Sequence, residues 1–374
     1  MLNADTREFE FVSDFDGLKV SAVIAKPSGN INGIVQIVHG MNEHKERYFE
    51  FMDYLAEEGF ITVIHDNRGH GKSICTPDDL GFMFRNGGKG FVEDIVQLKK
   101  TVRSVYPTYP YFILGQGMGS LGVRCMLKEH DEDLGGVVLL GCPCYSRFSG
   151  FVRSVNSAVS QKQGSRSRSD RIYEAWEDTM NRDFGGAPHS WISSRKEVVE
   201  DVNADPLCNF KYTLNGYEGL LYLMRETYSK SGWRVKNPNL PIRFISGRDD
   251  PCMISERKFF KAMQLLDKVG YESVSHRLFD GMRHDVLNEK NSINVYKDIA
   301  KTLYSWIDRL SGQQAETDAI AEVMDILQAE ERPAPVSEDK TPHTSEADVF
   351  DILESVMAAE EAAADTADTQ QKGE

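Results

Sequence analysis

The amino-acid sequence predicts an α/β fold built on a mostly parallel sheet. Up to residue 146, short and continuously apolar runs alternate with segments of helical period. Runs of this kind are typical of parallel strands that helices cover on both faces. A third observation is the stretch 111–122, where an apolar strand passes through alternate glycines directly into an apolar helix. This sharp strand–turn–helix unit is the centre around which the other elements are placed.

Each element follows from its local pattern. Residues 8–12 and 19–26 alternate in polarity around the turn 14–17, which predicts an antiparallel hairpin. The other runs are uniformly apolar and bounded by Gly, Pro or charged residues. The predicted strands are 8–12, 19–26, 34–38, 61–64, 111–114, 136–141, 241–247 and 275–279, eight in all. Helices are predicted at 49–56 (closed by Gly59), 91–106, from Leu121 onward, at 255–269 and at 291–310.

Between residues 147 and 235 the strand signal disappears. Helical stretches surround a Ser/Arg-rich loop at 164–169. A helical insertion at the carboxyl edge of a parallel sheet is where a lid over a substrate pocket is expected. Its aromatic residues either line that pocket or form the small core of the insertion itself; they are Tyr173, Trp176, Phe184 and Trp191. We therefore expect a core of residues 1–146 and 236–312, with a cap of residues 147–235.

The charge of the chain lies in its last segment. Residues 313–374 carry 17 acidic and 3 basic residues, a net of −14 out of −15 for the whole chain. Two apolar stripes with the same spacing occur there: Ile320, Val323, Met324 and Leu327, then Val349, Ile352, Leu353 and Val356. They predict two short amphipathic helices within a largely disordered acidic tail. The stripes either bind a protein partner or belong to a solubilising segment.

Composition excludes several classes of protein. Neither the body nor the tail offers a basic face for nucleic acid. No uncharged apolar stretch reaches the roughly 18 residues of a membrane helix, and no signal-peptide pattern follows Met1. The six cysteines are scattered, and the Cys142–Cys144 pair is too closely spaced for a usual zinc site. We expect reduced thiols and a cytoplasmic protein.

The candidate site is that of an acyl-transfer enzyme, which needs a nucleophile, a base, a carboxylate and oxyanion donors. The centre of the turn, where the pattern Gly-x-Ser-x-Gly places serine, is Gly117. His284 follows the last strand and is the candidate base. Asp250 follows the preceding strand and is the candidate orienting acid, with Asp249 as its competitor. The backbone amides of Met41 and Met118 are the candidate oxyanion donors.

The combined motifs resemble the monoacylglycerol lipase/lysophospholipase branch (serine aminopeptidase S33-type) of the α/β-hydrolases. The matching stretches lie within residues 5–310 and are specific together: His39-Gly40-Met41-Asn42-Glu43-His44, Asp66 to Ser73, the turn at 115–119, Asp250-Pro251, Gly281-Met282-Arg283-His284, Trp191 to Arg195 and Asp205 to Cys208. The resemblance implies an α/β-hydrolase fold with a mostly parallel eight-stranded sheet and a helical lid. It also implies a carboxylic-ester hydrolase of acylglycerols or lysophospholipids that uses no metal or cofactor. Gly40 and Gln116 would then contact substrate.

The chain departs from this family at its decisive position. The family has His-Ser where this chain has Gln116-Gly117, and glycine supplies no nucleophile. One hypothesis is an impaired form of an ester hydrolase, which the intact acid, base and oxyanion segments favour. The other is a natural pseudo-hydrolase that binds lipid or acts as a scaffold, which the second change at Gln116 favours. A lyase run by His284 and Asp250 is a third class.

Two substitutes for the missing serine are conceivable. Ser120 lies one turn into the helix, where the family has a similar small residue beside its true nucleophile, so a structural role is favoured. A water molecule activated by His284 would react slowly, because nothing fixes its position as a side chain would.

Overall fold

The computed structural model describes residues 4–145, 164–185 and 187–329. Contacts divide the chain into two compact units. Residues 1–99 and 109–307 form the first, and residues 100–108 and 308–374 form the second. The first unit contains the sheet and the whole candidate site.

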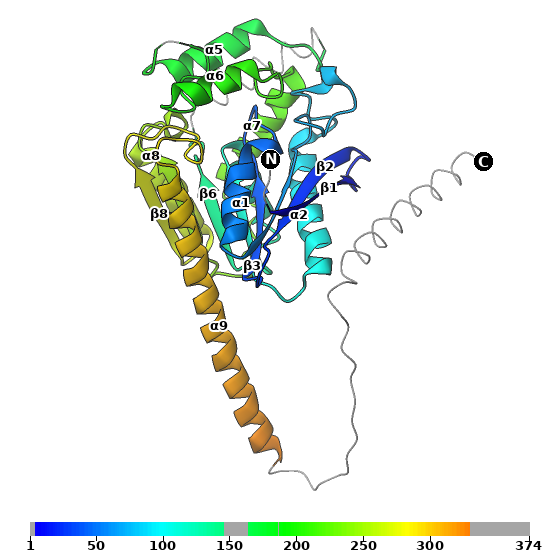
Figure 1. The fold of residues 1–374 in the computed structure, drawn as a ribbon, viewed down its shortest axis with the longest axis vertical. Coiled ribbons are helices and arrows are strands. Elements are labelled where there is room, and N and C mark those ends of the chain that lie inside the picture. Colours follow the sequence, from blue (N-terminus) through cyan, green and yellow to red (C-terminus); the bar gives the residue numbers. More distant parts are fainter. Residues whose placement is uncertain (1–3, 146–163, 186, 330–374) are drawn as a thin grey trace, which may run out of the picture. The chain divides into compact units, whose positions relative to one another are not determined.

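The sheet has eight strands in the order β1-β2-β4-β3-β5-β6-β7-β8. The β1/β2 and β2/β4 pairs are antiparallel, and all the other pairs are parallel. The strands are β1 (Asp5–Val12), β2 (Lys19–Lys26), β3 (Gly33–Val38), β4 (Phe60–His65), β5 (Tyr111–Gln116), β6 (Gly136–Leu140), β7 (Ile242–Gly247) and β8 (Val274–Phe279). The predicted fold class is therefore confirmed (Figure 1).

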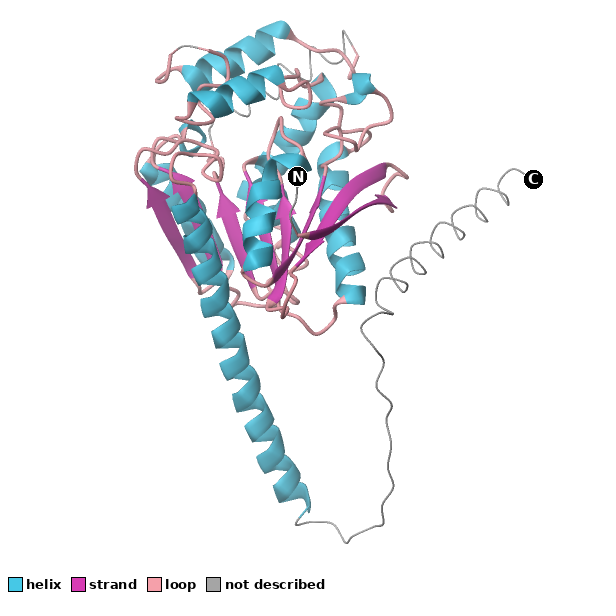
Figure 2. Cartoon of the chain, in the orientation of Figure 1, coloured by secondary structure: helices cyan, strands magenta, loops and turns pink. Residues whose placement is uncertain are grey.

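Helices cover the sheet because alternate strand residues point to opposite faces. In β5, Phe112 and Leu114 face one core, where side chains of the first and last helices pack. On the other face, the hydroxyl of Tyr111 donates to Gln36, whose amide donates to the Ile95 carbonyl. The helices, shown in Figure 2, are α1 (Phe49–Glu57), α2 (Gly87–Val105), α3 (Met118–Met126), α5 (Asp170–Asn181), α6 (Lys196–Ala204), α7 (Leu214–Tyr228), α8 (Glu256–Val269) and α9 (Ile293–Ala329).

The segment between β6 and β7 contains α5, α6 and α7. Within its described residues the only pairing of β type is an isolated bridge between Arg168 and Thr213, in agreement with the missing strand signal. Asn42, in the loop after β3, donates hydrogen bonds to the carbonyls of Cys208 and Phe210. The inserted segment is thus anchored to the carboxyl end of the sheet.

The last helix is longer than the pattern predicts. It does not end near Leu310 but continues as α9 to Ala329, so the first apolar stripe lies within it. Gly312 lies just beyond the predicted end, but Gly costs a helix only about 1 kcal/mol relative to Ala. The following residues are mostly strong helix formers, and the first proline is Pro333. The second stripe, and most of the expected disordered tail, lies outside the described residues.

Two further expectations concern membranes and thiols. Among the described residues, no helix combines the length and the apolar character that crossing a bilayer requires. All six cysteines are free, and five of them are buried.

A buried ion pair joins the loop after β4 to α2. Arg68 is fully buried, and its Nε and Nη2 donate to the two carboxylate oxygens of Asp94 at 2.9 and 3.1 Å. It also pairs with the partly exposed Asp16 at 2.9 Å. Arg68 therefore depends on Asp94 for most of its charge compensation.

We expect Asp94→Ala to lower the free energy of unfolding by about 3–5 kcal/mol, since it leaves a buried charge without its main partner. The matched change Asp16→Ala should cost about 1 kcal/mol or less, because that carboxylate is screened by solvent. Urea denaturation measures both values. Equal losses for the two variants would contradict this assignment.

Candidate active site

The turn between β5 and α3 has the geometry of a nucleophile elbow. Gly117, at its centre, has φ 51° and ψ −115°, a conformation that L side chains rarely adopt. Gly119 approaches β3 so closely that a Cβ there would lie 2.1 Å from the Val38 carbonyl oxygen. The amide of Gly117 donates to the Leu140 carbonyl at 2.9 Å and fixes the turn to β6. Only glycine fits position 119, and Gly117, at the centre of the turn, is itself buried.

The structure brings Asp250 and His284 together. Both carboxylate oxygens of Asp250 lie 3.1 Å from Nδ1 of His284. The same oxygens accept hydrogen bonds from the Cys252 amide at 2.8 Å and the Ser246 hydroxyl at 3.0 Å, which hold the carboxylate in place. The neighbouring Asp249 is exposed to solvent instead. Of the two competing acids, the structure therefore places Asp250 against the imidazole.

The free side of the imidazole faces the elbow. A Cβ built on Gly117 would lie 2.9 Å from Nε2 of His284, its nearest atom, and 3.7 Å from Cα of Gly40. The hydroxyl of Ser120 is buried and donates to the Gly117 carbonyl at 2.6 Å. Ser120 thus stabilises the turn, in keeping with the structural role favoured from the sequence.

The two candidate oxyanion segments border the same space. Met118 is the first residue of α3, so its amide has no acceptor within the helix. Met41 follows Gly40, whose amide donates to the Glu43 carboxylate at 2.9 Å. Glu43 also accepts the Tyr48 hydroxyl at 2.6 Å. Burial, together with the charge of Asp285, raises the pKa of Glu43 above its ordinary value. Glu43 thereby fixes the loop that carries Met41.

Gln116 is turned toward the base loop. It is fully buried, and its Nε2 donates to the backbone carbonyl of His284 at 3.1 Å. Its side-chain oxygen has no hydrogen-bond partner among the described residues. The structure therefore shows Gln116 supporting the backbone of His284.

Sequence reasoning missed the contacts between the insertion and the base loop. The Trp191 ring lies 5.1 Å from the His284 ring, centroid to centroid. The Arg283 guanidinium donates to the carbonyls of Ser190 and Ser193 and lies 4.2 Å from the Phe184 ring centroid. Trp191 also belongs to a small buried cluster with Ile192, Val202, Cys208 and Cys252. Trp191 thus belongs to the insertion's own core and also contacts the imidazole.

Cys252 was also overlooked, although its place two residues after Asp250 could have signalled it. Ligand atoms of Asp250, Cys252 and His284 all lie within 4.8 Å of one another. Burial alone would lower the pKa of His284, but its interactions with Cys252 and with the Asp250 carboxylate outweigh the effect of burial. The pKa of His284 is therefore raised well above its ordinary value of 6.5.

This shift predicts how stability depends on pH. A folded-state pKa above the unfolded value means that folding takes up a proton. The stabilisation is therefore complete below pH 6.5 and is lost as the pH rises through the folded-state pKa. We expect the difference in free energy of unfolding between the parent and His284→Gln to shrink as the pH rises above 6.5. Urea denaturation across a pH series measures it; a difference that grows with pH would contradict the shift.

Comparison with known proteins identifies the family. Residues 29–291 match the family described as serine aminopeptidase, S33. The chain belongs to this family. It is 24% identical to the monoacylglycerol lipase of Mycolicibacterium smegmatis over 81% of this chain and 98% of that protein. It is 28% identical to the monoglyceride lipase of Mus musculus over 78% of this chain and 91% of that protein.

A solved structure with a similar fold agrees with this assignment. The crystal structure of a thermostable carboxyl esterase from Bacillus coagulans, in complex with glycerol, superposes with a TM-score of 0.74. It is 26% identical, and the match covers 82% of this chain and 99% of that chain. The α/β-hydrolase fold implied by the sequence motifs is confirmed.

Proposed function

We propose that this chain carries the site of a carboxylic-ester hydrolase of the monoacylglycerol lipase/lysophospholipase type, without its nucleophile. The observation that carries the proposal is the position of His284. Its Nδ1 contacts Asp250, and its Nε2 lies 2.9 Å from where the Cβ of residue 117 would stand. His284, Asp250 and the elbow are arranged for nucleophilic attack by a side-chain hydroxyl at position 117. Glycine has no such hydroxyl. The acyl-enzyme route is therefore closed, and the parent chain is catalytically impaired.

The remaining roles follow from this arrangement. The amides of Met41 and Met118 would stabilise the oxyanion, and Gly40 and Gln116 would border the reacting carbonyl. Residues 147–235 would act as a cap, supported by the contact of Trp191 with His284. An acylglycerol substrate is supported by the names of the relatives, which are monoacylglycerol and monoglyceride lipases. A lysophospholipid is the alternative substrate that the sequence motifs imply. In this mechanism His284 transfers the protons, Asp250 orients and stabilises the imidazolium, and no metal or cofactor takes part.

A second candidate function is a pseudo-hydrolase that binds an acyl lipid or serves as a scaffold. Gln116 favours this function, because it is a second change beside the lost serine. Its side chain donates a hydrogen bond to the His284 carbonyl, so the new residue fits its surroundings. The acidic tail would then bind a protein partner.

Labelling with a fluorophosphonate probe separates the two candidates. We expect no labelling of the parent and stoichiometric labelling of Gly117→Ser, because the probe reports a serine activated by its base. Gly117→Ser with His284→Ala is the matched control and should stay unlabelled. A folded Gly117→Ser variant that remains unlabelled would favour the pseudo-hydrolase. Labelling of the parent would show that another residue is the nucleophile.

A further inference from the structure

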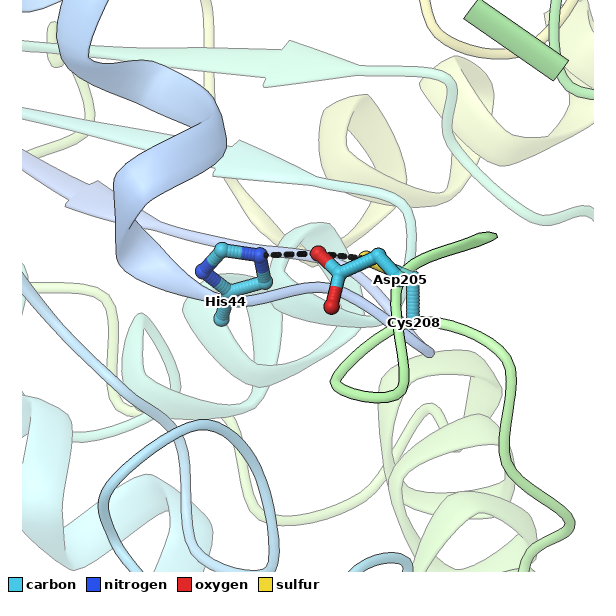
Figure 3. Close-up of side chains that lie close together, drawn as sticks. All are labelled: His44, Asp205 and Cys208. Carbon is cyan, nitrogen blue, oxygen red and sulfur yellow. Dashed lines mark hydrogen bonds and ion pairs between the residues drawn. The ribbon is translucent and has the colours of Figure 1, made fainter. Parts of the chain in front are cut away.

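A second cluster of metal-ligating side chains lies outside the catalytic dyad. Figure 3 shows His44, from the loop after β3, pointing toward Asp205 and Cys208 of the inserted segment. Nε2 of His44 lies 2.8 Å from Oδ2 of Asp205, and the Cys208 thiol donates to the same oxygen at 3.5 Å. The three ligand atoms all lie within 4.8 Å of one another. We infer that this cluster is a zinc-binding site that joins the inserted segment to the loop of the candidate oxyanion donor Met41.

The ligand types and distances fit Zn²⁺. Tetrahedral zinc with Zn–S of about 2.3 Å and Zn–O of about 2.0 Å separates sulfur and oxygen by roughly 3.5 Å. The distance between Cys208 and Asp205 already has this value. The corresponding N···O separation is roughly 3.3 Å, so His44 must withdraw by about 0.5 Å and lose its hydrogen bond to Asp205. Asp205 is partly exposed, which leaves access for a water molecule as fourth ligand.

The surroundings orient the ligands and balance the charge. Oδ1 of Asp205 accepts the Leu207 amide at 2.8 Å, so Oδ2 is the oxygen directed at the other ligands. Outer hydrogen bonds of this kind are a regular feature of metal sites. Binding of the ion would release the Cys208 thiol proton to solvent, and the resulting thiolate and the Asp205 carboxylate would together neutralise a divalent ion. The nearby Arg47 is engaged by Asp285 at 2.8 Å, which compensates its positive charge.

The two ligand segments are already tied together without an ion. Asn42, two residues before His44, donates to the Cys208 carbonyl at 2.9 Å. The Cys208 amide donates to the Asp205 carbonyl at 3.0 Å, so these two ligands share one turn. Binding therefore needs only a shift of side chains. A bound ion would fasten this turn to the loop that begins at Gly40.

The test is zinc and cobalt binding by the untagged full-length chain. We expect one equivalent of Zn²⁺ in competition with a chromophoric chelator and a rise in melting temperature. With Co²⁺ we expect a thiolate-to-metal charge-transfer band. Cys208→Ser should abolish the band and the zinc-dependent rise. Cys252→Ser, at the dyad's own Asp/Cys/His cluster, is the matched control and should keep both.

Two results would overturn the inference: absence of metal binding by the parent, or loss of the cobalt band in Cys252→Ser rather than in Cys208→Ser. The second result would place the ion at the dyad. If Cys208→Ser does not fold, the nearly isosteric Asp205→Asn decides the question. It should lower zinc affinity by more than the roughly 10–100-fold that loss of an outer partner costs. Unchanged affinity in a folded Asp205→Asn variant would likewise overturn the site.

Discussion

The Gly117→Ser variant is expected to hydrolyse p-nitrophenyl butyrate and monoacylglycerol about 10⁶-fold faster than the parent, since removing the serine from a Ser–His–Asp unit costs about that factor in kcat. The parent would keep only roughly 10³–10⁴-fold over water, from oxyanion stabilisation and binding. The reason is geometric. His284, with Asp250 at 3.1 Å behind it, faces the position of the missing side chain. Steady-state hydrolysis of both esters measures the gain.

The new side chain also carries a structural cost. A Cβ at position 117 lies 2.9 Å from the imidazole, so the ring must move by a few tenths of an ångström. The positive φ of 51° is strained for any L residue, and strain of this kind costs about 1–3 kcal/mol. Gly117→Ala is the matched control, because it introduces the same Cβ without an oxygen. It should lose similar stability and gain no activity. Equal activity in the Ala and Ser variants would refute serine as the nucleophile.

In the Gly117→Ser background, Asp250→Asn is expected to lower kcat about 10⁴-fold. The Asp250 carboxylate accepts a hydrogen bond from Nδ1–H and so keeps Nε2 unprotonated and free to act as the base. An asparagine amide can instead donate to Nδ1, which leaves the imidazole in the wrong tautomer. Asp249→Asn in the same background is the control, because that side chain is exposed to solvent. Ester hydrolysis under saturating substrate measures both. A comparable loss in the two variants would show that the acid is wrongly assigned.

The strands were predictable from the sequence because their apolar patterns match their burial in the sheet. The expected hairpin strand 19–26 coincides with β2, and the other strands differ from expectation by a few residues at their ends. Continuous apolar runs are informative because a parallel strand is buried on both faces. The end of α9 was not predictable from the same reasoning. Gly312 weakens a helix only slightly, and no local signal distinguishes such a weak position from a stop.

Chain order was enough to propose the members of the dyad but not its surroundings. Position after a strand suggested both Asp249 and Asp250, and only the structure shows which one faces His284. The sequence identifies Trp191 only as an aromatic residue of the insertion. Its contact with the imidazole spans more than ninety positions in the sequence. Such a contact depends on how the insertion packs, for which one sequence contains no periodic signal.

Hydrogen bonds between the loop 283–285 and the segment 190–193 link proton binding at His284 to the inserted segment. Arg283 donates to two carbonyls of the segment 190–193, and the amide of Asp285 donates to the Ile192 carbonyl at 2.8 Å. Between these two residues lies His284, with the Trp191 ring against it. Displacing the segment would expose the imidazole to water and change its proton affinity. By reciprocity, protonation of His284 must bias the segment's position with the same coupling free energy. The position of the inserted segment and the protonation of His284 are therefore two coupled equilibria, and the loop 283–285 is the part of the chain that couples them.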